Sequence, residues 1–412
     1  MPHTLLITGP GGSGRTTVAA ATALAAARQG RRVLLLSGDV GDPAGALTGE
    51  TAGEAEEVAP GLRATTAAHG LRVARVDSGE EFREELVALQ ERGSTLLGML
   101  GARPLGAEEL TELPGAEQFA LLRALRRAAT APRTDLVVVD LPPLHQALAT
   151  LALPAQLRRY LARLLPAERQ AARALRPVLA QLAGVPMPAQ WLYEAAARWD
   201  EELAAVQAVV EADTTEVRLV AEPGPAAADA VRLGRLGFAL QQLPVAAVVA
   251  NRTLPQGSAD PWLAGLAAEQ EKCAAQWAGE LPVIRLPHLG RAPRGPQDLA
   301  LLADGATDTD ADTGATDGLV PPPPAPRPAW AVEDRLAEDG VLVWVVPLPG
   351  AHKRELDLIR RGDELLLTAG PYRRIVPLPA ALRRCTVSGA ALAEDALRIR
   401  FTPDPGLWPR TR

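Results

Sequence analysis

The stretch TLLITGPGGSGRTT, residues 4–17, decides the fold of the N-terminal part of the chain. Its first five residues form an apolar run that is typical of a buried β-strand, and a helical pattern follows from Arg15 onward. The glycines between them let the backbone curl, so that successive N–H groups point inward at the oxygen atoms of an anion. The N-terminus of the following helix adds a favourable dipole. The stretch therefore predicts a phosphate-binding loop.

The residue types of this loop suggest roles for its members. We expect nucleotide phosphates to be bound by Gly11, Gly12, Ser13, Gly14, Arg15, Thr16 and Thr17. The Thr16 hydroxyl, directly after the basic position, is placed to ligate Mg²⁺. Arg15 carries a planar fork on a longer stem than lysine, so it can hold phosphates and yet place charge poorly at a transition state. A purely structural strand-to-helix turn is the alternative.

Further apolar runs follow at intervals and are separated by longer helical patterns. They are residues 31–37, 71–77, 135–140, 217–221, 245–251 and 281–287. Strands that alternate with helices indicate right-handed βαβ units. We therefore predict an α/β fold with a doubly wound, mostly parallel sheet. Residues 155–212 show helical spacing without a strand signal, which indicates a helical insertion.

The composition changes sharply after residue 303, which we take as the end of the first domain, residues 1–303. Residues 304–330 are acidic and then proline-rich, and such a segment buries too little apolar surface to fold, so we expect a linker. Short strands between turn residues predict a small antiparallel β-sandwich over residues 331–403. Residues 404–412 form a tail.

Charge and cysteine usage exclude several classes of protein. The net charge of −6 provides no basic field for nucleic acid. The only cysteines, Cys273 and Cys385, lie far apart, which fits a reducing compartment, and we expect a cytoplasmic protein. No uninterrupted apolar stretch of about 18 residues exists, so we expect no integral membrane segment. Positive charge is almost all arginine, because Lys272 and Lys353 are the only lysines.

Several segments together resemble the ArsA-type ATPases, a deviant-Walker branch of the P-loop NTPases. That family includes arsenite-pump ATPases and the ATPases that deliver tail-anchored membrane proteins. Its loop, GKGGVGKTT, aligns without a gap to GPGGSGRTT at residues 9–17. LLLSGDVGDP (34–43) resembles the switch I segment, DLPPLHQALATLALP (140–154) the switch II segment, and VVANRTLP (248–255) the adenine-reading segment.

The resemblance implies ATP and Mg²⁺ as cofactors and adds three site residues. Asp39 falls on the aspartate that positions the attacking water, which makes Asp39 and Arg15 the expected catalytic residues. Asp140 falls on the Walker B aspartate and joins Thr16 as a magnesium ligand, and Asn251 falls on the residue that reads adenine. The helical insertion lies where the family has its client- or metal-facing helices, and a homodimer is implied. The C-terminal unit resembles the small heat-shock-protein-like (α-crystallin-like) domain of some bacterial ArsA homologues.

The departures from the family pattern lie at positions of the glycine loop and switch II that carry the family's chemistry. Pro10 and Arg15 replace the two loop lysines, and Leu144 and His145 stand where switch II has threonine and glycine. Cysteines for arsenite and a zinc CxxC are absent, which disfavours arsenic transport. Two functions remain open: a weak or slow Mg-dependent ATPase that couples nucleotide state to a helical client- or partner-binding surface, and a catalytically dead pseudo-ATPase that acts as a scaffold or chaperone-like module. A partitioning-type ATPase is disfavoured, because the chain has no basic patch and no terminal amphipathic helix.

Overall fold

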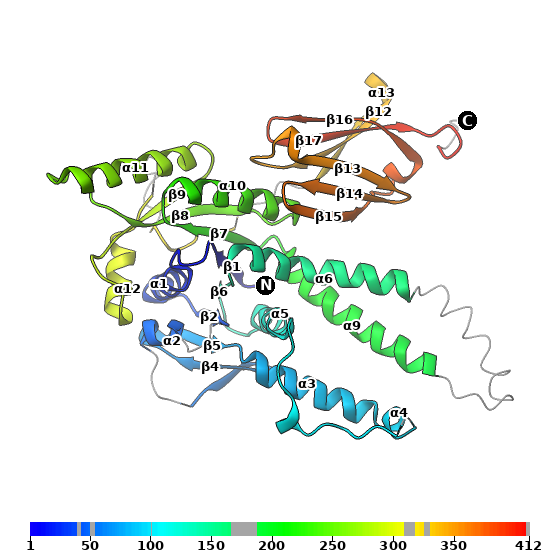
Figure 1. The fold of residues 1–412 in the computed structure, drawn as a ribbon, viewed down its shortest axis with the longest axis horizontal. Coiled ribbons are helices and arrows are strands. Elements are labelled where there is room, and N and C mark those ends of the chain that lie inside the picture. Colours follow the sequence, from blue (N-terminus) through cyan, green and yellow to red (C-terminus); the bar gives the residue numbers. More distant parts are fainter. Residues whose placement is uncertain are drawn as a thin grey trace.

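The computed structural model describes residues 1–38, 43–49, 54–99, 101–165, 188–308, 318–324 and 330–408. A large sheet flanked by helices forms the N-terminal part, and a smaller all-β unit packs against it (Figure 1). The predicted fold class, an α/β domain with a mostly parallel sheet and a C-terminal antiparallel unit, is confirmed.

The large sheet has ten strands in the order β10-β9-β8-β7-β1-β6-β2-β5-β4-β3. Pairing is parallel from β9 through β5 and antiparallel at the two edges. The strands are β1 (His3–Thr8), β2 (Val33–Ser37), β3 (Glu56–Ala59), β4 (Leu62–Thr66), β5 (Arg72–Arg75), β6 (Leu136–Asp140), β7 (Thr215–Ala221), β8 (Val245–Thr253), β9 (Val283–Pro287) and β10 (Thr307–Asp308). All seven predicted strands are present.

Helices cover both faces of this sheet, which explains the continuous apolar runs. Successive side chains of β1 alternate between two cores: Leu5 and Ile7 pack toward α1 and α12, whereas Leu6 packs toward the opposite face. The helices of this domain are α1 (Arg15–Arg28), α2 (Pro43–Thr48), α3 (Ser78–Arg92), α4 (Ser94–Met99), α5 (Ala116–Ala129), α6 (Leu144–Leu164), α9 (Pro188–Val210), α10 (Pro225–Leu240), α11 (Pro261–Ala278) and α12 (Gly295–Asp304), with short 3₁₀ turns at Ala68–Gly70 and Ala107–Glu109.

The predicted helical insertion corresponds to two long helices that pack side by side, α6 and α9 (Figure 1). Helix α6 starts at Leu144, directly after the β6 segment, and continues through Pro154 into the region expected to be the insertion. The middle of the insertion, residues 166–187, lies outside the described residues. Among the helices that the structure describes, none is both long and apolar enough to cross a membrane.

Part of the predicted linker packs against the first domain. Leu319 is buried in the core on the α1 side of the sheet, and the Arg31 guanidinium donates to the Pro321 carbonyl at 3.1 Å. The buried Arg218 of β7 donates to the carbonyl of Leu319. Residues 309–317 and 325–329 of the linker, and residues 409–412 of the tail, lie outside the described residues.

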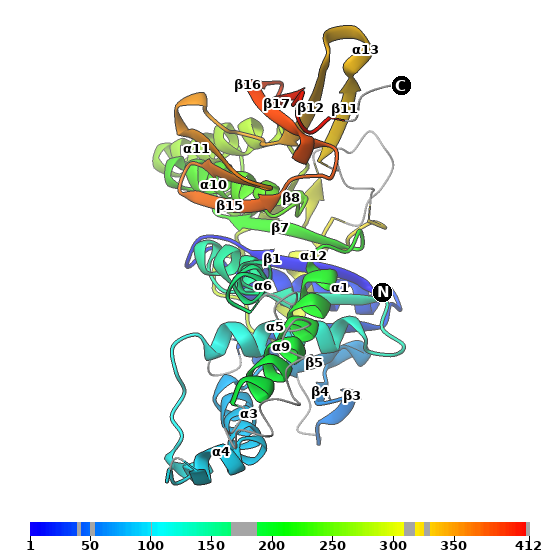
Figure 2. The same cartoon turned by 90° about the vertical axis from the view of Figure 1, so that its right-hand side faces the viewer.

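The C-terminal unit consists of two antiparallel sheets, β11-β12-β17-β16 and β13-β14-β15. Their elements are β11 (Ala331–Arg335), α13 (Leu336–Asp339), β12 (Val341–Pro347), β13 (Leu356–Arg361), β14 (Glu364–Ala369), β15 (Tyr372–Pro377), β16 (Cys385–Ala393) and β17 (Ala396–Pro403), with 3₁₀ turns at Lys353–Glu355 and Leu382–Arg384. Leu236 and Leu240 of α10 belong to the same apolar core as this unit. The unit therefore shares its core with the first domain, and β15 lies next to α10 (Figure 2).

Candidate functional site

The glycine loop, residues 9–14, joins β1 to α1 at the carboxyl end of the central strand of the sheet. Gly12 and Gly14 have φ angles of 78° and 89°, in the left-handed region that favours glycine. A Cβ at Gly9 would overlap the carbonyl oxygen of Val220 on β7, and one at Gly14 would overlap the Asn251 amide. Glycine is thus required at Gly9 and Gly14 by close neighbours, and at Gly12 and Gly14 by the left-handed backbone.

The loop has one buried hydroxyl group without a partner. Ser13 is 5% exposed, and its Oγ has no hydrogen-bond partner among the residues that the structure describes. Such a group normally bonds to protein, water or a ligand when it is buried. Together with the inward-curled backbone, it fits an anionic ligand with several acceptor oxygens.

The Arg15 side chain contacts the segment after β6. Its guanidinium donates to the carbonyl oxygen of Leu141. Two further bonds tie the same segment to the loop region: Thr8 Oγ1 donates to the Pro142 carbonyl at 2.8 Å, and the Leu144 N–H donates to the Gly9 carbonyl at 3.0 Å. Hydrogen bonds therefore connect the region of the glycine loop to the start of α6.

The expected magnesium ligands lie on neighbouring elements at this edge. Asp140 ends β6 and is 3% exposed, and it accepts a hydrogen bond from Ser37 Oγ of the adjacent strand at 3.3 Å. Thr16 lies in the first turn of α1, beside the partly buried Thr17. A carboxylate and a hydroxyl are hard oxygen ligands of the kind that Mg²⁺ prefers, so the donor set fits this ion. Asp39, the expected water-positioning residue, lies outside the described residues.

Asn251 and Arg252, near the end of β8, both reach the glycine loop. The Asn251 amide donates to the Ser13 carbonyl at 2.8 Å, and the Arg252 guanidinium donates to the Gly12 carbonyl at 3.0 Å. Asn251, the expected adenine contact, thus lies beside the loop, and its role in reading adenine stays a prediction. Arg252 was not predicted as a site residue. The sequence feature that could have indicated it is its position directly after Asn251.

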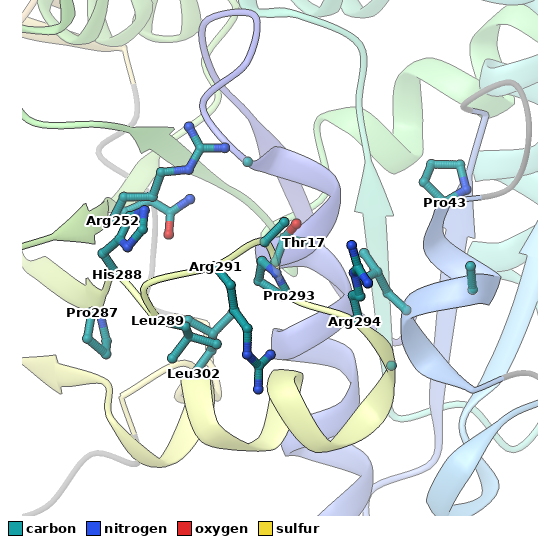
Figure 3. A pocket seen from close by; sticks show the side chains of 16 residues that line it. Thr17, Pro43, Arg252, Pro287, His288, Leu289, Arg291, Pro293, Arg294 and Leu302 are labelled. Atoms are coloured by element: carbon teal, nitrogen blue, oxygen red, sulfur yellow. The ribbon is translucent and has the colours of Figure 1, made fainter.

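A cavity of about 600 Å³ opens beside the loop (Figure 3). Its walls combine the start of α1, the region around α2, the end of β8 and the loop between β9 and α12. Among the described residues that line it, three are arginines and none carries a carboxylate. The lining residues are Gly14, Thr17, Pro43, Ala46, Leu47, Asn251, Arg252, Pro287, His288, Leu289, Arg291, Ala292, Pro293, Arg294, Gly295 and Leu302. Sequence reasoning missed the segment from 287 to 295, whose arginines and prolines directly follow a strand.

The C-terminal unit contacts α6 both in its first turn and in its C-terminal half. The Tyr372 hydroxyl lies 3.4 Å from Nδ1 of His145, and Arg159 makes a bidentate pair with Glu364 at 2.8 and 2.9 Å. Burial raises the pKa of Tyr372 to about 12, so its hydroxyl stays protonated at neutral pH. Hydrogen bonds from Arg159 lower the pKa of Glu364 below its usual range. His145 and α6 are thereby joined to β14 and β15.

Comparisons with known proteins agree with this architecture. A family model described as anion-transporting ATPase, of ArsA type, matches residues 3–303, and one described as an HSP20-like domain found in ArsA matches residues 339–401. The uncharacterised protein SCO2128 of Streptomyces coelicolor is 57% identical, with 100% of both chains covered. Protein Rv2184c of Mycobacterium tuberculosis is 30% identical over 98% of this chain and 97% of its own length.

A more distant relative has a descriptive name. The putative arsenical pump-driving ATPase 1 of Aquifex aeolicus is 24% identical over 96% of this chain and 98% of its own length. The family models, the sheet order and the glycine loop agree, and the chain belongs to the ArsA family of anion-transporting ATPases, with an HSP20-like domain at its C-terminal end.

Proposed function

We propose that this chain binds Mg-ATP in the cavity beside the glycine loop and hydrolyses it slowly. The observation that supports this most is the charge of the described part of the cavity wall, which has three arginines and no carboxylate in a chain of net charge −6. A polyanion fits such a wall, and the loop amides offer it hydrogen-bond donors. Family membership in the ArsA ATPases supports the same ligand.

Each predicted site residue has a role in this proposal. The loop from Gly11 to Thr17 holds the phosphates, with the Ser13 hydroxyl as an additional donor. Thr16 and Asp140 hold Mg²⁺, which neutralises phosphate charge when it is bound. Asn251, beside the loop, contacts the base. Asp39 orients the attacking water.

Slow turnover follows from the position of Arg15. Its guanidinium donates to the Leu141 carbonyl, so its charge points at the protein backbone rather than into the loop. A cation that stabilises the transition state is worth about 3–4 kcal/mol, and its loss slows turnover by about two to three orders of magnitude. Pro10 has no charge and no N–H donor with which to compensate.

We further propose that nucleotide state is passed to a helical surface. Helices α3, α5 and α9 enclose an apolar cavity of about 320 Å³, whose wall includes Phe82, Leu86, Leu89, Phe119, Trp199 and Leu203. An amphipathic helix from a client protein has the apolar face that fits this groove. Helix α6 starts at the switch II segment and packs against α9, so a shift at the loop can reach the groove.

A pseudo-ATPase that acts as a scaffold is the second candidate. Arg15 bonded to Leu141, Pro10 in the loop and His145 in switch II favour it. Arsenical transport, which the names of some relatives mention, is not part of either proposal. The only two cysteines are buried and lie in different domains: Cys273 is in α11 and Cys385 is in β16.

Thermal unfolding with and without Mg-ATP tests binding. A ligand at 100 times its dissociation constant stabilises the folded state by about 2.7 kcal/mol, so the melting temperature should rise by several degrees. Phosphate release then separates the two candidates, with Asp39→Asn as the variant that should keep binding and lose turnover. Light scattering with and without nucleotide tests the homodimer that the family resemblance implies. The ATPase proposal fails if saturating Mg-ATP leaves the melting temperature unchanged.

A further inference from the structure

We infer that Arg252 supplies, from the end of β8, a positive charge that binds the phosphate chain of the nucleotide. This inference rests on the proposed function. It concerns a residue that lies outside the glycine loop and that the sequence pattern does not assign to the site.

The backbone at Arg252 is arranged so that its side chain can reach the loop. Consecutive residues of a regular strand point to opposite faces of the sheet. Asn251 and Arg252 nevertheless both donate to loop carbonyls, at 2.8 and 3.0 Å. The register with β9 shifts between Ala250 and Thr253, and Arg252 has a φ of 57°, in the left-handed region. This irregularity redirects the Arg252 side chain toward the loop, as bulges beside functional sites do.

Neighbouring groups hold this unusual backbone in place. The Gln270 side chain of α11 donates to the Arg252 carbonyl at 3.3 Å and accepts from the Leu254 N–H at 2.8 Å. An arginine is rarely found at positive φ, and the conformation costs energy that the surroundings must offset. The contacts with Gln270 fix the main chain and leave the guanidinium free to exchange partners.

The present partners of the guanidinium can be exchanged at little cost. Arg252 pairs with Glu222 at 3.1 Å, and the two side chains are 44% and 50% exposed. Ion pairs with this exposure contribute only about 0–1 kcal/mol. Two oxygens of a phosphate group beside the loop would offer a bidentate, charge-assisted partner, which is the geometry that a guanidinium matches best.

The other arginines near the cavity are less well placed for this role. Arg15 donates to the Leu141 carbonyl, and Arg291 pairs with the buried carboxylate of Asp298. Arg294 lies across the cavity, in the segment that leads into α12 (Figure 3). Arg252 both lines the cavity and donates to the Gly12 carbonyl of the loop, so its guanidinium is held at the edge of the loop.

Calorimetric titration with adenosine and with Mg-ADP tests the inference. Arg252→Ala should weaken Mg-ADP binding by about 10- to 100-fold, the range for losing a charge-assisted hydrogen bond, and leave adenosine binding unchanged. Arg252→Lys keeps the positive charge but lacks the planar guanidinium. Its affinity for Mg-ADP should lie between those of the parent chain and Arg252→Ala. The control is Arg398→Ala on β17, because Arg398 is 38% exposed and pairs with Glu333 at 3.3 Å, much as Arg252 pairs with Glu222. It should leave both affinities unchanged.

The outcomes separate this inference from the proposed function. Mg-ADP that binds Arg252→Ala as tightly as it binds the parent chain overturns the role of Arg252 and leaves nucleotide binding intact. An equal loss for adenosine and Mg-ADP also overturns it, because the residue would then only shape the site. A parent chain that binds neither compound overturns the proposed function and this inference together. Thermal unfolding of the ligand-free variants shows whether the fold is retained.

Discussion

The hydroxyl of Tyr372, on β15 of the C-terminal unit, lies 3.4 Å from Nδ1 of His145, in the first turn of α6. His145 stands where the family pattern of switch II has glycine. The same turn begins at Leu144, whose N–H donates to the Gly9 carbonyl of the glycine loop. A residue that departs from the family pattern therefore contacts the C-terminal unit. This arrangement favours a C-terminal unit that restrains the start of α6.

Removal of the Tyr372 hydroxyl tests this restraint. Tyr372→Phe keeps the ring beside Gly237 and loses only the contact with His145. We expect faster amide hydrogen exchange in the first turns of α6. Without the contact to His145, local unfolding of these turns costs less free energy. The free energy of unfolding should fall by about 0.5–1.5 kcal/mol, the usual worth of one hydrogen bond. Exchange measured by mass spectrometry over residues 144–151 checks this.

Tyr160→Phe is the matched control for this variant. Tyr160 is on the same helix, and its side chain is 51% exposed. Its substitution should leave exchange in the first turns of α6 at the parental rate. Parental exchange in Tyr372→Phe as well would show that the hydroxyl does not hold this turn.

The Arg159–Glu364 pair should make docking of the C-terminal unit dependent on pH. Hydrogen bonds from Arg159 lower the folded-state pKa of Glu364 below its ordinary value of 4.5. A lowered folded-state pKa means that the pair stabilises the fold above pH 4.5, and that this contribution is lost as the pH falls through the folded-state pKa. Glu364→Gln should therefore cost about 0.5–1 kcal/mol at neutral pH and nothing in strong acid.

Urea unfolding of the parent and of Glu364→Gln at a series of pH values measures this difference. Asp357→Asn, which removes an exposed carboxylate on the neighbouring strand β13, serves as the control and should show no such trend. A difference between parent and Glu364→Gln that stays constant down to strong acid would contradict the assignment to this ion pair.

The strands of the large sheet could be predicted because they are buried on both faces. Residues 136–139 of β6 are all fully buried and all apolar, and such runs stand out in a sequence. The hairpin of β3 and β4 was missed because it lies at the edge, where polar side chains such as Glu56 and Glu57 remain exposed. The sequence feature that could have indicated this hairpin is the Pro60-Gly61 pair. In the structure it forms the turn, with Gly61 at a φ of 71°.

The site was predictable where it depends on local sequence. The glycine loop, Asp140 and Asn251 lie at the same edge of the sheet, because β1, β6 and β8 are parallel and end there, and their roles in binding stay predictions. The contact of Arg252 with the loop depends on an irregularity at the end of β8 that the pattern VVANRTLP does not reveal. The contact between His145 and Tyr372 joins residues 227 positions apart, and no local pattern encodes it.

Two glycines of the loop should respond differently to alanine. At Gly9 a Cβ would overlap the Val220 carbonyl, which belongs to the backbone of a central strand and cannot move away easily. Gly9→Ala should lower the free energy of unfolding by about 1–3 kcal/mol, as overpacking does. At Gly11 a Cβ meets open space, and Gly11→Ala should stay within about 0.5 kcal/mol of the parent.

Denaturant unfolding of the two ligand-free variants gives this comparison directly. Similar stabilities would mean that the loop does not pack against β7 as described. Because the measurement is made without nucleotide, it reports on the fit of the loop alone and is independent of any role in binding.

Restoration of lysine at both altered loop positions tests whether the remaining machinery can hydrolyse ATP. Arg15 now donates to the Leu141 carbonyl, and a lysine has a compact charge on a shorter stem that can turn into the loop. Pro10→Lys with Arg15→Lys should raise the rate of phosphate release by at least about tenfold, which corresponds to about 1.4 kcal/mol of transition-state stabilisation. Asp39→Asn in the same background should abolish the gain.

The control for this variant is Arg28→Lys, which exchanges the same residue types at the other end of α1, where Arg28 pairs with Asp304 at 2.9 Å. It should leave phosphate release unchanged. If the double variant binds ATP as tightly as the parent and releases no more phosphate, the missing lysines are not what limits the reaction. The limit would then lie in the altered switch II, where His145 replaces a residue without a side chain, and the scaffold would be the better description of this chain.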